Sequence, residues 1–60
     1  MAQQTKNAIR RAFIQLLNER PLDKISIKDI AEKGAVNRNT FYYYYADIYA
    51  LVEDLSLIHI

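Results

Sequence analysis

The chain has no cysteine and only one glycine and one proline among its 60 residues. Without cysteine, neither a disulfide nor a thiolate zinc site can stabilise the core. Scarce glycine and proline, with 52% hydrophobic residues, suit a compact helical domain and argue against disorder or a β-sandwich. No apolar run approaches the roughly 20 residues that span a membrane, and the N-terminus lacks the apolar core of a signal peptide. We therefore expect a single small domain in the cytoplasm with no membrane association.

The net charge of +1 conceals an uneven distribution. Residues 1–46 carry all eight basic residues and four acidic residues, whereas residues 47–60 carry three acidic residues and no lysine or arginine. Basic residues gathered in one part of a small domain suit a polyanionic partner. Ordinary solvated helix faces produce the same pattern, so charge alone leaves both interpretations open.

Apolar residues at helical spacing predict a first helix from about residue 5 to residue 19, with Thr5 as its N-cap. This helix is expected to end before Pro21, because a residue that precedes proline is pushed out of the α region. Residues 21–24 then form a loop.

Three shorter helices are predicted after this loop. Ser26 and Asp29 have the spacing of a capping box, which begins a second helix. Asn37 is the predicted cap of a third helix that ends near Tyr44, and Asp47 begins a fourth. The predicted fold is therefore all-α, a three-helix helix-turn-helix head plus the start of a fourth helix. Its expected core is Ile9, Phe13, Leu16, Leu17, Ile25, Ile30, Ala31, Val36, Phe41, Tyr45 and Leu51.

The third helix, residues 38–44, has the size and composition of a helix that reads DNA in the major groove. At 100° per residue, Phe41 and Tyr45 face the core, whereas Asn39 and Tyr43 point to the opposite side. Asparagine can bond to adenine and arginine to guanine, and tyrosine offers a flat apolar face to a thymine methyl group. The predicted base contacts are Arg38, Asn39 and Tyr43, and the predicted phosphate contacts are Ser26, Lys28, Asn37, Thr40, Tyr42 and Tyr44.

From about residue 5 to residue 55 the chain resembles the N-terminal DNA-binding domain of the TetR/AcrR (tetracycline-repressor) family of transcriptional regulators. The matching segments are AFIQLLNE, ISIKDIAEKGAVNRNTFYYYY and ADIYALVEDL. The resemblance implies that the head binds double-stranded DNA at a palindromic operator half-site, and that the full-length protein is a homodimer and usually a repressor. It also implies a C-terminal domain that dimerises and binds an inducer, which this chain lacks, so the fragment itself is expected to be monomeric.

Carried over residue by residue, the resemblance implies that Ser26 and Thr40 contact phosphates and that Phe41 packs in the core. It places Asn37, Arg38 and Asn39 at the variable opening of the recognition helix, and Tyr42 and Tyr43 where side chains touch backbone and bases.

The chain departs from the family pattern at three places. Gly34-Ala35-Val36 stands where the family has Ala-Gly-Val, so a positive φ at Ala35 costs on the order of 1 kcal/mol, unless the turn shifts to use Gly34. Tyr44-Tyr45 replaces a common His-Phe, and a buried Tyr45 needs a partner for its hydroxyl. Ile48 replaces a lysine that grips a phosphate, which lowers the expected affinity for DNA.

Residues 55–60, LSLIHI, resemble translated sequencing-adapter reads and are expected to be a non-native tail of a truncated reading frame. The lone His59 lies in this tail, and no catalytic set, cofactor loop or metal-ligand spacing occurs, so we expect neither an enzyme nor a metal or cofactor site. Two alternatives to DNA binding stay open. They are a protein-interaction module that uses the exposed tyrosines and the fourth helix, and an inert fragment. Steep loss of affinity with salt distinguishes a DNA-binding protein from an apolar protein interface.

Overall fold

The computed structural model describes the backbone of residues 2–57 and the side chains of residues 4–56. Its elements follow the order α1 (Ala2–Glu19), a 3-10 turn η1 (Leu22–Lys24), α2 (Ile27–Lys33), α3 (Arg38–Tyr44) and α4 (Ile48–Leu57). No strand occurs within residues 2–57, which confirms the all-α prediction. The last residues of the predicted tail, 58–60 with His59, lie outside the described residues, whereas residues 55–57 belong to α4.

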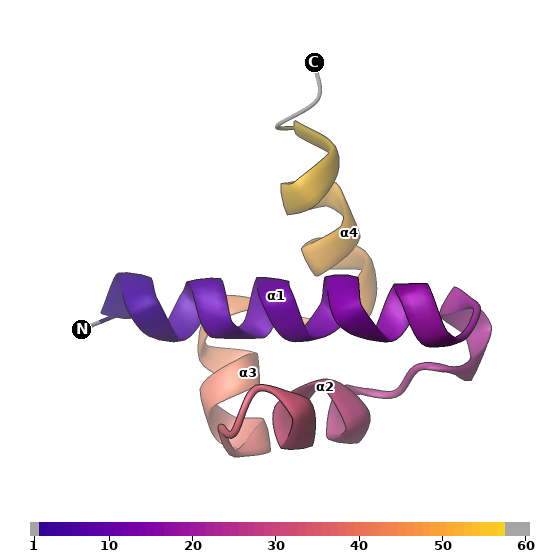
Figure 1. Ribbon diagram of the computed structural model, residues 1–60. Coiled ribbons are helices and arrows are strands. Elements are labelled where there is room, and N and C mark those ends of the chain that lie inside the picture. Colours follow the sequence, from indigo (N-terminus) through magenta and orange to yellow (C-terminus); the bar gives the residue numbers. More distant parts are fainter. Residues whose placement is uncertain (1, 58–60) are drawn as a thin grey trace.

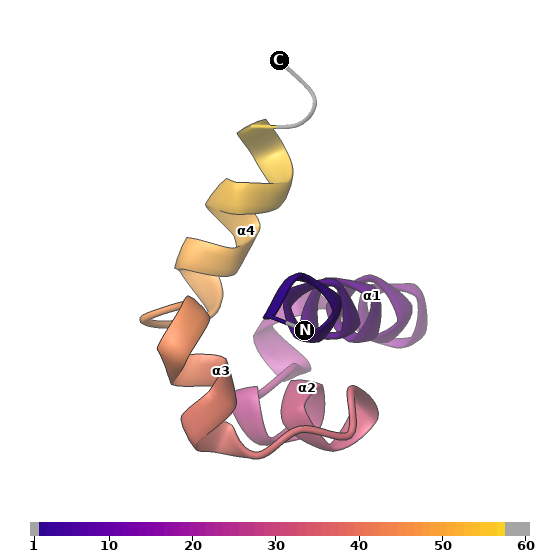
Figure 2. The same cartoon turned by 90° about the vertical axis from the view of Figure 1, so that its left-hand side faces the viewer.

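α1 crosses the middle of the molecule (Figure 1). The two short helices α2 and α3 lie on one side of it, and α4 leads away on the other side, as the second view also shows (Figure 2). The outer surface of α2 and α3 is therefore not covered by α1 or α4 in either view.

α1 begins three residues earlier than predicted, at Ala2, so Thr5 lies inside the helix and its predicted capping role was wrong. The alanine and glutamines that precede Thr5 have good helix propensity, so nothing local stops the helix there. At the other end, the segment after Pro21 is a single 3-10 turn, closed by a 3.0 Å hydrogen bond from the Lys24 N–H to the Pro21 carbonyl.

α2 begins at the predicted capping box. The Ser26 hydroxyl accepts a hydrogen bond from the Asp29 N–H at 3.1 Å, and the Asp29 carboxylate accepts one from the Ser26 N–H at 3.0 Å. The bond from the Ser26 backbone is the main cause that lowers the pKa of Asp29. Arg20 lies 3.4 Å from the same carboxylate and ties the end of α1 to the start of α2.

The turn between α2 and α3 places its positive φ on Ala35 and not on Gly34. Ala35 has a φ of 59°, whereas Gly34 has a φ of −85°. The Val36 N–H donates to the Ala31 carbonyl at 2.9 Å and the Ala35 N–H to the Glu32 carbonyl at 3.2 Å, which is the pattern of a Schellman motif. The turn therefore does not shift to use its glycine, and Ala35 bears the left-handed conformation.

Gly34 serves the packing of α1 against this turn instead. A Cβ atom at position 34 would lie 3.3 Å from the carbonyl oxygen of Ala8 and 3.5 Å from the Cβ of Ala12, both in α1. The missing side chain thus lets the turn approach α1 closely.

Local caps also begin the last two helices where they were predicted. Asn37 Oδ1 accepts the Thr40 N–H at 2.8 Å at the start of α3. Asp47 Oδ1 accepts the Ala50 N–H at 2.9 Å at the start of α4.

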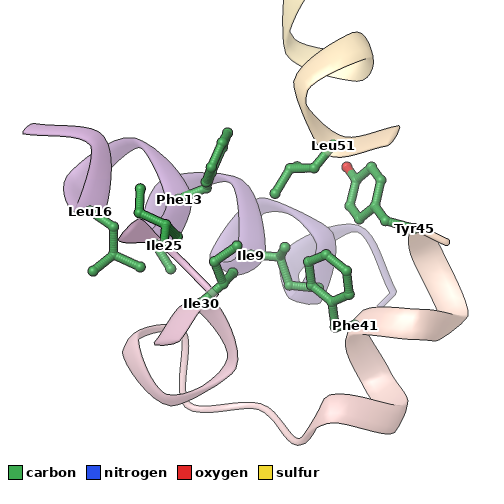
Figure 3. Close-up of a cluster of buried hydrophobic side chains, with 9 residues drawn as sticks. Ile9, Phe13, Leu16, Ile25, Ile30, Phe41, Tyr45 and Leu51 are labelled. Carbon is green, nitrogen blue, oxygen red and sulfur yellow. The ribbon is translucent and has the colours of Figure 1, made fainter. Parts of the chain in front are cut away.

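The core lies between α1 and the other three helices (Figure 3). Two predicted members differ from expectation, since Leu17 is 42% exposed and Val36 is only partly buried. Leu17 has the helical spacing of the core but lies at the edge of the buried stripe, where no other element covers it. The buried residues are Ile9, Ala12, Phe13, Leu16, Ile25, Ile30, Ala31, Phe41, Tyr45 and Leu51.

Candidate nucleic-acid interface

The two faces of α3 differ in chemistry and in exposure. Phe41 is completely buried against the core, whereas Tyr43 is 81% exposed. Arg38 and Asn39 are also exposed. Because Asn39 and Tyr43 are four residues apart, they lie one above the other on the outward face. The structure therefore places two of the predicted base contacts, Asn39 and Tyr43, on the open side of the helix. Arg38 is exposed as the first residue of the helix and lies roughly 100–140° around the helix axis from those two.

Contacts between rings restrain the tyrosines of α3. Tyr42 meets the buried Phe41 edge to face, with ring centroids 5.8 Å apart. Tyr44 is half-buried against the core, and its ring meets that of Tyr43 edge to face at 5.0 Å. Aromatic pairs with this geometry stabilise by about 1 kcal/mol beyond area burial. The highly exposed Tyr43 is thus supported by a neighbour that is itself fixed by the core.

The predicted phosphate contacts at the start of α2 are accessible. Ser26 and Lys28 are both exposed. The Ser26 hydroxyl acts as an acceptor in the capping box, so its own proton stays available to a further acceptor.

Thr40 differs from Ser26 in this respect. It is half-buried, and its hydroxyl donates to Asn37 Oδ1 at 3.0 Å, so its proton is already used within the cap of α3. The remaining donor of this pair is the amide group of Asn37, which is exposed.

The positive charges of the helix-turn-helix fall into two groups. Lys33 pairs with Glu19 at 3.2 Å, and Arg20 pairs with Asp29, so acidic neighbours partly neutralise them. In the part of the chain that the structure describes, Lys28 and Arg38 lie in no ion pair. Both side chains are exposed.

Ile48, at the first position of α4, is half-buried and packs against the core. It therefore contributes apolar contact where a lysine would present a charge. The next residue, Tyr49, is 72% exposed, a feature that the sequence did not single out.

A polar cluster behind α3 was also missed from the sequence, although a partner for Tyr45 was expected. The Tyr45 hydroxyl donates to Asp54 Oδ2 in α4 at 2.7 Å. Arg10 Nε lies 3.8 Å from the same oxygen, and Lys6 Nζ lies 5.8 Å from the centroid of the Tyr45 ring. Burial, followed by the hydrogen bond to Asp54, raises the pKa of Tyr45 well above its ordinary value, so the hydroxyl stays protonated as a donor. The sequence did contain a signal for this cluster, namely a tyrosine predicted to be buried that is followed by a helix with acidic residues.

Other kinds of site find no support in the described residues. No group of histidine, cysteine, aspartate or glutamate side chains there could hold a metal ion. None of the helices that the structure describes has the length and apolar character needed to cross a bilayer.

Comparison with known proteins places these features in a family. The family model described as bacterial regulatory proteins, tetR family, matches residues 9–55. The chain is 34% identical over 55 residues to the uncharacterized HTH-type transcriptional regulator YxbF of Bacillus subtilis (strain 168). The aligned segment covers 92% of this chain and 14% of that protein. It is 41% identical over 48 residues to the uncharacterized HTH-type transcriptional regulator YvdT of the same organism. This alignment covers 80% of this chain and 25% of that protein.

No solved structure matches the chain. The chain spans about a quarter or less of the length of these two curated relatives, and the match falls on the segment that folds into the helix-turn-helix. With the family model matching most of its residues, the chain belongs to the tetR family of bacterial regulatory proteins.

Proposed function

We propose that the chain binds double-stranded DNA in a sequence-specific manner, with α3 in the major groove. The observation that carries this proposal is the outward face of α3, where Asn39 and Tyr43 are exposed while Phe41 on the opposite face is buried. Arg38 is exposed at the start of the same helix. Arginine and asparagine side chains recognise guanine and adenine edges, and a tyrosine ring packs on a thymine methyl group. Arg38, Asn39 and Tyr43 are the base contacts of this proposal.

Phosphate contacts then orient α3 in the groove. Ser26 and Lys28 at the start of α2 supply a hydroxyl proton and a charge, and the hydroxyls of Tyr42 and Tyr44 extend the contact along α3. The proposed contact at Thr40 requires its hydroxyl to release Asn37, so in this pair the Asn37 amide group is the more direct donor.

In the regulator of which this head is a part, we propose a homodimer that places two heads on a palindromic operator. The relatives' description as HTH-type transcriptional regulators supports a regulatory role for such a complex. Occupation of an operator by the proposed dimer would repress transcription by excluding other proteins. A single head covers one half-site and is expected to bind weakly. Its site of action is the cytoplasm, where bacterial DNA lies, and it performs no catalysis.

Salt dependence tests DNA binding by this surface. With one cation, Lys28, on a phosphate, the affinity for a duplex should fall roughly threefold between about 50 and 200 mM salt. The assay is fluorescence anisotropy of a labelled duplex titrated with the chain at several salt concentrations. An affinity that does not change over this range would contradict the proposal.

Protein docking is a second candidate function, and one observation favours it. An apolar groove runs between α1 and α4 and is lined by Phe13, Leu17, Leu22, Val52 and Leu55. A partner held in this groove would bind by apolar contact and respond little to salt. The same titration, with anisotropy measured on a labelled partner, separates this function from DNA binding.

A further inference from the structure

The contacts behind α3 converge on one carboxylate. Asp54 in α4 accepts a hydrogen bond from Tyr45, the residue that directly follows α3, and lies within 3.8 Å of Arg10 in α1. We propose that Asp54 is a positioning residue for DNA binding, which fixes the recognition helix α3 against α1 and α4 through the Tyr45 hydroxyl. The inference deepens the proposed function and rests on it.

Tyr45 transmits this restraint directly to α3. Its N–H donates to the Phe41 carbonyl at 2.9 Å, so it is the C-cap of the helix. Its ring lies 5.8 Å from that of Phe41, the buried anchor of α3. A displacement of the Tyr45 ring therefore moves the end of the helix that carries Tyr43.

The Tyr45 hydroxyl has a strong reason to keep this bond. The residue is only 5% exposed, and its oxygen points toward α4 near Leu51 (Figure 3). A buried hydroxyl without a partner is costly, whereas a bond to a carboxylate is short and strong, as the 2.7 Å distance indicates. A phenylalanine at this position would fill the same space without linking α3 to α4.

Two cations of α1 complete the cluster. Arg10 supplies the opposite charge for the half-buried Asp54, and Lys6, one turn earlier, lies over the Tyr45 ring. The carboxylate thus joins the long helix α1, the end of α3 and the second turn of α4. Nothing in this cluster involves Ser26 or Lys28, which contact phosphates from α2 in the proposed complex.

This separation predicts a specific consequence for binding. Base readout requires side chains held within about 0.5 Å and 10–20° of their productive geometry, whereas phosphate contacts tolerate more movement. Loss of the Asp54–Tyr45 bond should therefore lower the affinity for the preferred half-site by about tenfold and leave the affinity for a scrambled duplex within about twofold.

The test compares Tyr45→Phe, Asp54→Ala and the double variant of the 60-residue chain, each titrated against the preferred and the scrambled duplex. The double variant should lose no more discrimination than either single variant, because both remove the same bond. Asp54→Asn should restore part of the discrimination, since the amide oxygen still accepts. Matched controls are Tyr49→Phe and Glu53→Ala, which remove a hydroxyl and a charge from exposed positions of α4. Unchanged discrimination in a folded Tyr45→Phe variant would overturn the proposal.

Amide hydrogen exchange without DNA provides a second readout. In Tyr45→Phe, the backbone amide of residue 45 at the end of α3 should exchange faster than in the parent chain, while the Gly34 and Val36 amides at the end of α2 keep their protection. Uniform loss of protection would mean a structural role only and overturn the proposal. If the parent chain shows no preference among duplexes, the proposed sequence-specific function is contradicted. Hydrogen exchange would still show, in that case, whether Asp54 restrains α3. No change in exchange at Tyr45 defeats that restraint as well.

Discussion

Replacing Ala35 with glycine should stabilise the chain, although glycine usually weakens a folded structure. Ala35 has a φ of 59°, where an L-residue suffers contact between its Cβ atom and the following carbonyl oxygen. This contact costs about 1–2 kcal/mol, and glycine removes it. Glycine also adds about 0.4–1 kcal/mol of conformational freedom to the unfolded chain. The free energy of unfolding should therefore rise by about 0.5–1 kcal/mol on balance.

Thermal unfolding followed by circular dichroism measures this change. For a domain of this size, the midpoint should rise by roughly 2–8 °C. Ala50→Gly provides the matched control, because it makes the same chemical change inside α4, where φ is negative. The control should lose about 1 kcal/mol. A loss of stability in Ala35→Gly, similar to that of Ala50→Gly, would refute the left-handed conformation at Ala35.

Three further predictions concern the interface and its support. Tyr43→Ala should reduce the preference for one duplex over others, whereas Thr40→Ala should weaken all duplexes alike because it removes a proposed phosphate contact; equal, sequence-blind losses in binding assays would contradict these roles. Lys28→Ala should flatten the slope of log affinity against log salt by about 0.9, measured by anisotropy, and an unchanged slope would remove Lys28 from the phosphate contacts. The pKa of Asp29 is lower in the folded state than its ordinary value of 3.8. The carboxylate therefore contributes its full stabilisation above about pH 3.8, and this contribution is lost as the pH falls through the folded-state pKa. The difference in urea stability between parent and Asp29→Asn should therefore shrink in acid, and a constant difference would contradict the capping-box bond.

Features decided by neighbouring residues could be predicted from the sequence. The capping box at Ser26 and the caps at Asn37 and Asp47 depend on side chains that bond three residues away, so spacing alone locates them. The sequence predicted strain at Ala35 only if the turn places its positive φ there. The structure shows that residue 35, and not residue 34, has the positive φ. Thr5 shows the limit of this reasoning, because a residue with cap propensity does not end a helix that its neighbours extend.

Features that depend on packing between helices could not be predicted. Leu17 has the periodicity of the core but lies where α4 leaves a groove open. The predicted burial of Tyr45 already implied that its hydroxyl needs a hydrogen-bond partner. That this partner is Asp54 depends on how α4 crosses α1, which the sequence does not reveal. The hydrogen bond from the Thr40 hydroxyl to Asn37 Oδ1 could not be predicted either, and it makes the Asn37 amide group the better donor to a phosphate.

Selection from a random duplex library by the purified chain at low salt tests the central claim most directly. If α3 reads bases through Arg38, Asn39 and Tyr43, sequencing of the bound duplexes should recover one short recurring half-site. The enrichment should disappear in Tyr43→Ala. Recovery of no preferred sequence by the folded chain would contradict sequence-specific DNA binding by this surface.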